Sequence, residues 1–231
     1  MNKEMRLRFE GVTLAGDPHY ETGLEEVCFE LRAGELMVVR LIGDLVFTPL
    51  ADAAQGLCSP EAGKVWLGEE CWGEVAADRE QGMRHRMGRV FEQEAWLSNL
   101  DVDENITLAE RYHTDRPEAE IYAEAEALAR AFGLPGLPTT RPAMTPRLDL
   151  DRCEWVRALL GSPEVVILER PGRDVPMRYT ETLMKKVNEV RGRGGAAMWI
   201  TNDPEVWSHP HFSQALHFVI EGSKMSSIAK P

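Results

Sequence analysis

The sequence predicts an α/β fold, in which the buried strands of a layered sheet alternate with helices through right-handed crossovers. Three short segments, 36–39, 165–168 and 197–201, are almost entirely apolar, as strands covered on both faces are. Segments 151–160 and 180–190 have helical patterns, and each precedes one of these strands. The 231 residues, 43% of them hydrophobic, are enough for one domain with a sizeable core.

The first part of the chain predicts antiparallel strands. Residues 5–13 and 26–31 alternate apolar and polar side chains, which is typical of strands with one buried face. A turn at 32–34 separates the second of them from the buried strand 36–39. Shorter strands are expected at 64–67, 88–91 and 216–220, the first after a turn at 59–63 and the last before a turn at 221–222.

A helical insert is expected at about residues 101–145. Asp101 and Asp103 can cap an amphipathic helix, and Pro117 opens an Ala/Glu-rich stretch. Glycines and prolines between residues 133 and 138 end the helical pattern. We therefore expect residues 1–231 to form a single domain, with an antiparallel β part at the front and a helical part in the middle.

Composition argues against two classes of partner. The chain has 38 acidic and 26 basic residues and a formal charge of −12, which is the wrong sign for binding nucleic acid or an anionic membrane surface. The start of the chain carries charge where a signal peptide needs an apolar run, and no stretch approaches the ~18 apolar residues of a membrane span. We expect a soluble protein without nucleic acid and without direct membrane insertion.

The cysteines and histidines predict neither a disulfide framework nor a metal site. The four cysteines are far apart without C-x-x-C spacing, so reduced thiols in a cytoplasm are expected. The three histidines near the end of the chain are unevenly spaced around Pro210, and zinc ligands need to converge within one turn or loop. These residues are Cys28, Cys58, Cys71 and Cys153, and His209, His211 and His217.

Six stretches in register give the chain a family resemblance. In order they read RAGELMVV, SPEAGKVWLG, GRVFEQEAWLSNLDVDENITL, RALLGSPEVVILERP, AAMWITNDPEV and HFVIEGSKM. Over residues 6–225 the sequence resembles the nucleotide-binding domain of an ATP-binding cassette (ABC) transporter. The resemblance implies a RecA-like P-loop NTPase fold with an antiparallel β subdomain and an inserted α-helical subdomain.

The resemblance fails at the phosphate-binding loop, the Walker A motif, which aligns with Leu41–Pro49. A P-loop presents glycine N–H groups and a lysine to phosphate at a helix N-terminus. Here Phe47 stands at the lysine position, Asp44 adds negative charge, and Gly43 alone offers glycine-like backbone freedom. We expect Thr48 to cap the following helix rather than to bind magnesium.

The Walker B strand is kept, but its chemistry is not. Glu169 stands where the resemblance places the magnesium-organising aspartate, and Arg170 where it places the catalytic glutamate. A guanidinium cannot act as a general base toward water. Glu169 is therefore interpreted as an acid paired with Arg170 or Arg173, with magnesium binding as the less favoured alternative.

Three further nucleotide elements are altered. Asn202 takes the place of the switch histidine, and Gly16 that of the aromatic that stacks on the base, although Tyr20 is a possible substitute. The signature loop holds no Leu-Ser-Gly-Gly pattern. Its positions are occupied by Thr145, Pro146, Arg147, Leu148 and Asp149.

The resemblance also implies a head-to-tail dimer, in which each nucleotide lies between the Walker A motif of one subunit and the signature of the other. A chain that has lost both motifs leaves neither site complete, whether it pairs with itself or with a related ABC subunit. We expect a pseudo-ATPase with no catalytic residues, no bound metal and no cofactor.

One segment is predicted to bind a partner. It follows the strand at 88–91 and resembles the loop that receives a coupling helix of a membrane permease, and an aromatic residue beside leucines is typical of an interface. Core packing of Trp96 between two subdomains is an equally favoured alternative. The candidate docking residues are Glu92, Trp96, Leu97, Asn99 and Leu100.

These observations predict a structural or regulatory ABC subunit that docks on a permease, peripheral to the membrane. The segment AWLSNLDVDENITL most resembles the corresponding segment of ATP-binding subunits of Mla-type (MCE) lipid transporters, which suggests lipid transport. Two other functions stay open. One is a weak ATPase, in which Glu169 gathers magnesium and Tyr20 holds the base and ATP is the cofactor; the other is a soluble regulator that pairs with an active ABC subunit.

Overall fold

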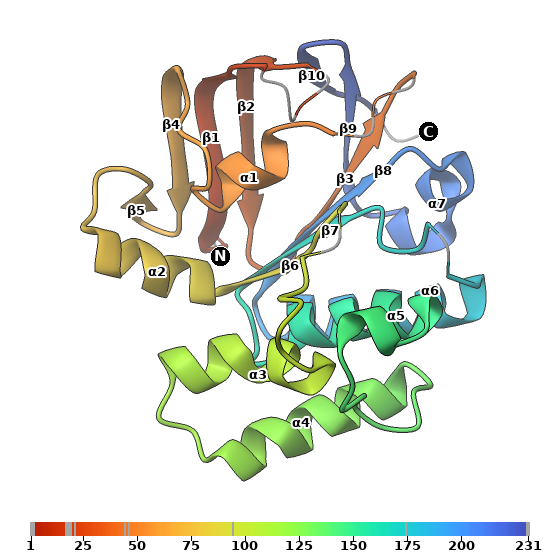
Figure 1. Cartoon of the computed structure of the whole chain (residues 1–231). Helices are drawn as coiled ribbons and strands as arrows, with labels where there is room; N and C mark the ends of the chain where they lie inside the picture. The colour runs from red at the N-terminus through yellow and green to blue at the C-terminus, as the bar shows by residue number, and fades with distance from the viewer. Residues whose placement is uncertain are drawn as a thin grey trace.

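One long sheet organises the computed structural model of this protein (Figure 1). The structure describes residues 3–16, 20, 22–43, 45, 47–93, 95–173 and 175–229. Within them the strand order is β5-β4-β1-β2-β10-β9-β3-β8-β7-β6. The sheet has an antiparallel part built mainly from the beginning of the chain and a parallel part built from strands that are far apart in sequence.

The antiparallel part contains β1 (Met5–Leu14), β2 (Leu24–Arg32), β4 (Ala62–Leu67) and the short β5 (Glu70–Cys71). Strand β1 pairs antiparallel with both β2 and β4. Phe9 lies opposite Phe29, and their stacked rings are 4.6 Å apart between centroids. The alternation at 5–13 and 26–31 is confirmed as a pair of strands with one buried face.

The parallel part contains β3 (Leu36–Leu41), β6 (Met87–Val90), β7 (Val165–Glu169), β8 (Ala196–Thr201) and β9 (Leu216–Glu221). Neighbouring strands β3, β8, β7 and β6 are all parallel, and β9 runs parallel to β3. Strand β10 (Lys224–Ser227) returns antiparallel to β9. The continuously apolar segments are therefore central strands, as predicted.

The helices join these strands. Helix α3 (Val102–His113) begins after Asp101, as expected, and α4 (Glu118–Ala131) after Pro117; together they form the lower part of Figure 1. Helix α5 begins at residue 147, four residues before the expected start, because Pro146 has φ −55° and already suits a helix start. The remaining helices are α1 (Leu50–Ala54), α2 (Ala77–His85), α5 (Arg147–Leu159), α6 (Met177–Gly192) and α7 (Pro204–Ser208), with short 3-10 turns at Pro142–Met144 and Pro210–Phe212.

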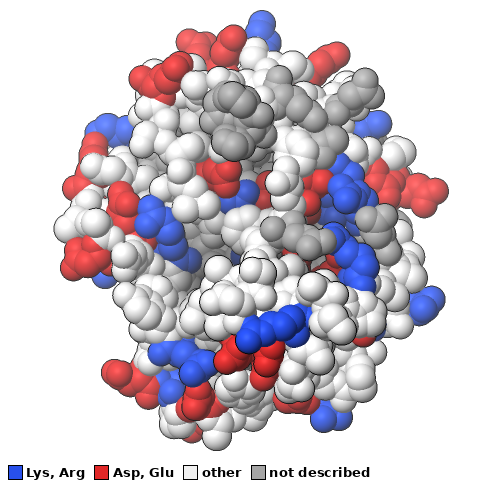
Figure 2. Space-filling model, in the orientation of Figure 1, with Lys and Arg blue, Asp and Glu red and all other residues white. Residues whose placement is uncertain are grey.

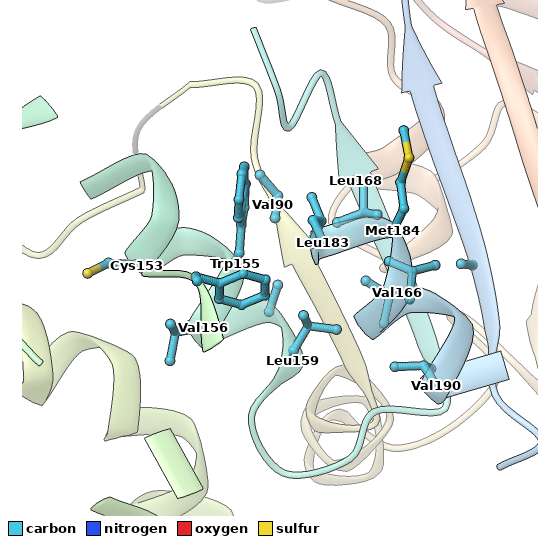
Figure 3. Close-up of a cluster of buried hydrophobic side chains, with 14 of the residues drawn as sticks. Val90, Cys153, Trp155, Val156, Leu159, Val166, Leu168, Leu183, Met184 and Val190 are labelled. Carbon is cyan, nitrogen blue, oxygen red and sulfur yellow. The ribbon is translucent and has the colours of Figure 1, made fainter. Parts of the chain in front are cut away.

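Two buried clusters hold the sheet in place. One lies between the parallel strands and helices α3 to α6, around Trp155, whose indole N–H donates to the Pro171 carbonyl at 2.9 Å (Figure 3). The other fills the space between the antiparallel strands, the opposite face of the parallel strands and α1. The carboxyl ends of β3, β6 and β7 therefore meet beside α1 on a rigid support, where ligands of α/β proteins bind.

The described part of the chain contains no helix with the length and apolar character needed to cross a membrane.

Candidate functional site

A cleft of about 320 Å³ lies at the carboxyl ends of the parallel strands, next to α1. Its walls come from the loop after β3, from α1, and from the residues at and beyond the ends of β6 and β7. Several of the residues predicted from the sequence meet here. The lining is Tyr20, Phe47, Thr48, Asp52, Arg89, Phe91, Glu92, Gln93 and Glu169.

Arg89 on β6 lies at the centre of one wall and is buried. Its Nε donates to Glu169 Oε2 at 2.7 Å, and its Nη1 donates to Asp52 Oδ1 at 2.5 Å and to Gln55 Oε1 at 3.2 Å. The guanidinium carbon also lies 4.4 Å from the centre of the Phe91 ring, in cation–π range. Arg89 thus ties α1, β6 and the end of β7 together.

The ion pairs of Arg89 determine which groups on the cleft wall are charged. Burial opposes the charge of Arg89, but Glu169 and Asp52 outweigh that effect and raise the pKa of Arg89, so it stays cationic. Burial raises the pKa of Glu169, and the nearby Arg89 works against this rise. The second oxygen of Asp52 accepts from the Tyr20 hydroxyl at 2.5 Å. Both carboxylates are therefore held by this chain's own donors.

Glu169 was expected to pair with Arg170 or Arg173, and this expectation is wrong. Both arginines instead reach Glu92, whose Oε1 lies 3.2 Å from Arg170 Nη1 and 2.9 Å from Arg173 Nη1. Glu169 forms its ion pair with Arg89, because Arg89 points into the cleft from the neighbouring strand β6. Glu92 was expected to be a docking residue. Its side chain is only 6% exposed, so it is not available to a partner.

The sequence is similar to ATP-binding proteins of bacterial transporters. No protein-family model matches the chain. It is 27% identical over 188 residues to the sulfate/thiosulfate import ATP-binding protein CysA of Xanthomonas campestris, which is 80% of this chain and 53% of that protein. It is 25% identical over 185 residues to the lipoprotein-releasing system ATP-binding protein LolD of Granulibacter bethesdensis, 79% of this chain and 80% of that protein. The alignment spans about half the length of the CysA relative.

Solved structures decide the fold. The dimeric bacterial ABC transporter cassette MJ0796 superimposes with a TM-score of 0.82 over 96% of this chain and 99% of that one, at 16% identity. An ATP-binding subunit of an ABC transporter gives 0.79 over 96% and 90%, at 18% identity. The chain has the ABC cassette fold. Its sequence is similar to the ATP-binding proteins of ABC transporters, so the RecA-like fold predicted from the six stretches is confirmed.

The segment that aligns with the Walker A motif lies between β3 and α1. Gly43 has φ +75°, the left-handed conformation that favours glycine, and no other atom would come near a side chain there. Phe47 lines the cleft, and Asp44 lies outside the described residues. Thr48 was expected to cap the helix, but α1 begins at Leu50 with Pro49 at the cap position, so the hydroxyl of Thr48 is one residue too early.

A magnesium nucleotide does not fit these residues. The cleft brings two carboxylates to one wall and holds them on a single guanidinium, so that the wall carries no free positive charge for phosphate. The position of the phosphate-binding lysine is an aromatic ring that lines the cleft. The carboxylate at the magnesium position, Glu169, is already bound to Arg89.

The signature positions of the cassette bind within their own chain. Thr145 is buried and shares a hydrogen bond with Thr140 at 2.9 Å. Arg147 pairs with Asp151 at 2.8 Å, and Asp149 pairs with Arg152 at 2.5 Å. Pro146 has no N–H to donate, and Leu148 packs against the core cluster around Trp155. Thr145 and Pro146 lead into α5, and Arg147, Leu148 and Asp149 form its first turn.

Two further predicted positions lie at the edges of the cassette site. Asn202 follows β8, where Asp203 caps the short helix α7 by accepting from the Glu205 N–H at 2.8 Å. Tyr20 lines the cleft, but its hydroxyl binds Asp52, which fixes the ring as a part of the network around Arg89. Gly16 lies after the end of β1.

The candidate docking loop is held from inside by Asn105 on α3. Its side-chain oxygen accepts from the Leu97 N–H at 2.8 Å, and its amide donates to the carbonyls of Leu97, Leu100 and Asp101 at 3.0 to 3.2 Å. Trp96 is half-buried against the core cluster and against Arg157, whose guanidinium carbon lies 4.5 Å from the ring centre. Core packing of Trp96 is thus observed, while Leu97 and Asn99 remain exposed and Leu100 is half-buried.

The histidines near the end of the chain do not converge. His217 packs edge-on against Trp207 at 4.8 Å, whereas His209 contacts His211 at 5.3 Å between ring centres. Trp207 and Phe212 beside them are buried in the core cluster around Trp155. Among the residues that the structure describes, no group of three or more His, Cys, Asp or Glu side chains is arranged to hold a metal ion.

The sequence reasoning missed Arg89, Asp52, Gln55 and Asn105. A charged residue inside the short buried strand MGRV needs a partner, and an acid in the Ala-rich segment LADAA offers one. That pairing was the available signal.

Proposed function

We propose that this chain is a nucleotide-independent ABC cassette, a pseudo-ATPase that docks on a membrane permease as a structural or regulatory subunit. The observation that carries the proposal is Arg89, buried between Asp52 and Glu169 in the cleft. The arginine links the elements that a magnesium nucleotide would otherwise link. Removing one partner from such a buried pair costs about 3–5 kcal/mol, so this link is not easily exchanged for a ligand.

The catalytic side of the cleft supports the same proposal. Hydrolysis needs a base that accepts a proton from water, and the residue at that position is Arg170. Its guanidinium pairs with Glu92, which stands where the family shares a glutamine with magnesium. The weak-ATPase alternative is disfavoured, because Glu169 and Tyr20, its two assumed ligand contacts, are both engaged in the network around Arg89.

A docking surface beside the loop supports the permease as partner. Leu97 is 48% exposed, and Leu108 and Tyr112 are exposed on the outer face of the neighbouring helix α3. A second cleft of about 180 Å³ lies between α2, α3 and α5, and its walls carry apolar side chains such as Ile106 and charged ones such as Arg84 and Glu110. An exposed apolar surface beside a groove suits the apolar face of a helix.

The relatives support a place in a transporter. CysA is named for sulfate/thiosulfate import, and LolD for a lipoprotein-releasing system. We propose a cassette on the inner face of a membrane, paired with itself or with a related cassette as MJ0796 is. The segment AWLSNLDVDENITL, together with the similarity to a lipoprotein-releasing system protein, favours a lipid-linked cargo.

Affinity purification of the chain from its native membranes tests the proposal. Wild type is expected to bring down a protein with several membrane spans, and Leu97→Asp is expected to lose it. Leu57→Asp is the matched control, because Leu57 is also a surface leucine, 53% exposed, but lies after α1. Recovery of a soluble cassette without any membrane protein would contradict docking and select the regulator alternative instead.

A further inference from the structure

Two imidazole rings join helix α2 to helix α3 beside the second cleft. His85 is the last residue of α2, and His113 is the last residue of α3. Their rings are stacked, 4.9 Å apart between centroids and 28° from parallel. Both residues line the cleft of about 180 Å³, and the two helices lie next to each other in Figure 1. This pair of titratable groups is separate from the network around Arg89.

Glu110, also on α3, faces the ring of His85 from a fixed position. Its carboxyl group is buried, with Oε1 3.4 Å from His85 Nε2, while Oε2 accepts from Arg116 Nη1 at 2.7 Å. Arg116 in turn donates to Glu124 on α4 at 2.6 Å. The chain leaves room for this carboxyl group at Gly161, where a β-carbon would come within 1.9 Å of Glu110 Oε1. His85 is therefore placed against a carboxylate that cannot easily move away.

The last turn of α2 connects two parts of the molecule. Met83 is the only buried residue of this helix, so its attachment depends on polar contacts near its end. Arg84 donates to two backbone carbonyls at the end of α1, at 3.1 and 2.8 Å, and the next residue, His85, faces α3. A change of charge at the two stacked rings therefore acts on the junction between α2 and α3.

The two rings accommodate one proton more readily than two. A proton on His85 is matched by the Glu110 carboxylate, whereas a second proton, on His113, places two cations against each other. Burial and the neighbouring His85 lower the pKa of His113, and Glu110 works against this effect. His85 Nδ1 is buried with no hydrogen-bond partner among the described residues, while His113 is exposed and can turn its ring toward water. Further charged groups around the rings are Arg84 on α2, Arg116 after α3, Glu124 on α4 and Arg157 on α5.

We propose that His85 and His113 form an acid-sensitive clasp between α2 and α3, closed while at most one ring is protonated and open when both are. In the open state the ring of His113 leaves His85 and turns to solvent. The ring of Tyr112 packs edge-on against His113, 4.7 Å between centres, and Tyr112 is 73% exposed. Opening of the clasp therefore alters the exposed face of α3.

The clasp stands on the geometry of this chain, and only its effect on docking rests on the proposed function. Tyr112 belongs to the surface proposed to meet a permease, so opening at acid pH is expected to weaken docking. Failure of the permease experiment would leave the clasp intact, since its own test uses the isolated full chain.

Proton NMR of the histidine rings in the full chain, between pH 4.5 and 8, tests the clasp. The signals are identified by their loss in His85→Gln and in His113→Gln. The nuclear Overhauser contact between the two rings is expected at pH 8 and is expected to disappear once both rings are protonated. The His113 midpoint is expected below the ordinary histidine value of 6.5 in wild type and closer to 6.5 in His85→Gln, which lacks the opposing charge.

A control and a second measurement keep the test decisive. His211→Gln, in the 3-10 turn Pro210–Phe212, is expected to leave both the loss of the ring contact and the His113 midpoint unchanged. Amide hydrogen exchange in α2, corrected for its intrinsic pH dependence, is expected to speed up through the His113 midpoint in wild type but not in His113→Gln, which cannot carry the second charge. A ring contact that survives with both rings protonated, or a His113 midpoint that does not move in His85→Gln, would overturn the proposal.

Discussion

At the scale of single residues, Arg89 organises the wall of the cleft. A guanidinium in a buried strand is costly unless carboxylates surround it, and here two carboxylates and an amide oxygen do so. Asp52 and Glu169 would in turn be uncompensated without Arg89. The three side chains therefore depend on one another, and the phosphate site they occupy is charge-matched without any ligand.

Replacing Arg89 tests this dependence. Arg89→Met leaves two carboxylates facing a buried apolar side chain and is expected to lower the free energy of unfolding in urea by about 3–5 kcal/mol. Arg130→Met is the matched control, since Arg130 pairs with Glu126 on the exposed surface of α4 and is expected to change stability by less than about 0.5 kcal/mol. Equal stability of the two variants would show that the buried network contributes nothing.

Glu154 predicts a pH dependence of stability. Because burial raises its pKa from 4.5 to about 7, the folded chain binds the proton more tightly than the unfolded chain. The resulting stabilisation is complete below pH 4.5 and is lost as the pH rises to about 7, a change of roughly 3 kcal/mol at ~1.4 kcal/mol per unit.

Denaturation of wild type and Glu154→Gln at a series of pH values measures this change. The difference between the two is expected to fall as the pH rises from 4.5 to 7 and to be constant above that. A difference that does not vary with pH would mean that Glu154 titrates as an ordinary glutamate.

The sequence alone shows which residue stands at each motif position, but it does not show which residues that side chain contacts. That Phe47 stands where the resemblance places the lysine, and Arg170 where it places the base, was predicted from the sequence alone. That Glu169 binds Arg89 does not, because the two are joined by neighbouring strands that are far apart in the chain. Pairing across a sheet depends on strand order, which a single sequence leaves open.

At the scale of elements, the docking loop shows how one side chain shapes a segment. Asn105 replaces the missing regular structure of residues 97–101 with four hydrogen bonds from α3. Trp96 closes the other side by packing on Arg157. The loop is thus preorganised, which lowers the cost of binding a partner.

Asn105→Ala tests the preorganisation. The substitution removes the acceptor of the Leu97 N–H and the donor to the Leu100 carbonyl, while the Leu97 and Asp101 carbonyls keep backbone donors, and it is expected to lower the free energy of unfolding by about 1–3 kcal/mol. Asn99→Ala, in the same loop but exposed, is expected to have little effect. If Asn105→Ala were as stable as Asn99→Ala in urea denaturation, water would be replacing these bonds.

Elements were predictable where apolar periodicity was strong. The buried strands β3, β7 and β8 and the helices α3 and α4 lie where the pattern puts them. Helix α2 was missed because its only buried residue is Met83, so that it has almost no apolar face to detect. The start of α5 was placed too late because its first turn, RLDL, carries charge where an apolar pattern was sought.

At the scale of the whole molecule, the fold is independent of the chemistry it usually supports. The two buried clusters on either face of the parallel strands are made of apolar side chains, and the second includes Leu41 and Leu50, at the two ends of the loop before α1. Acidic and basic side chains are interspersed over the face in Figure 2, without a large region of one sign. The cassette fold is therefore kept in a chain whose cleft wall carries ion pairs between its own side chains.

Equilibrium binding of Mg-ATP to the full chain tests the central claim most directly. Binding is monitored by the melting temperature of the protein at nucleotide concentrations up to the millimolar range. A ligand that binds only the folded chain stabilises it by about 2.7 kcal/mol at a hundred times its Kd. We predict no rise in melting temperature for wild type or for Phe47→Lys, since restoring the lysine leaves Arg89, Asp52 and Glu169 in place. A saturable rise in wild type, with matching heat of binding by calorimetry, would contradict the account.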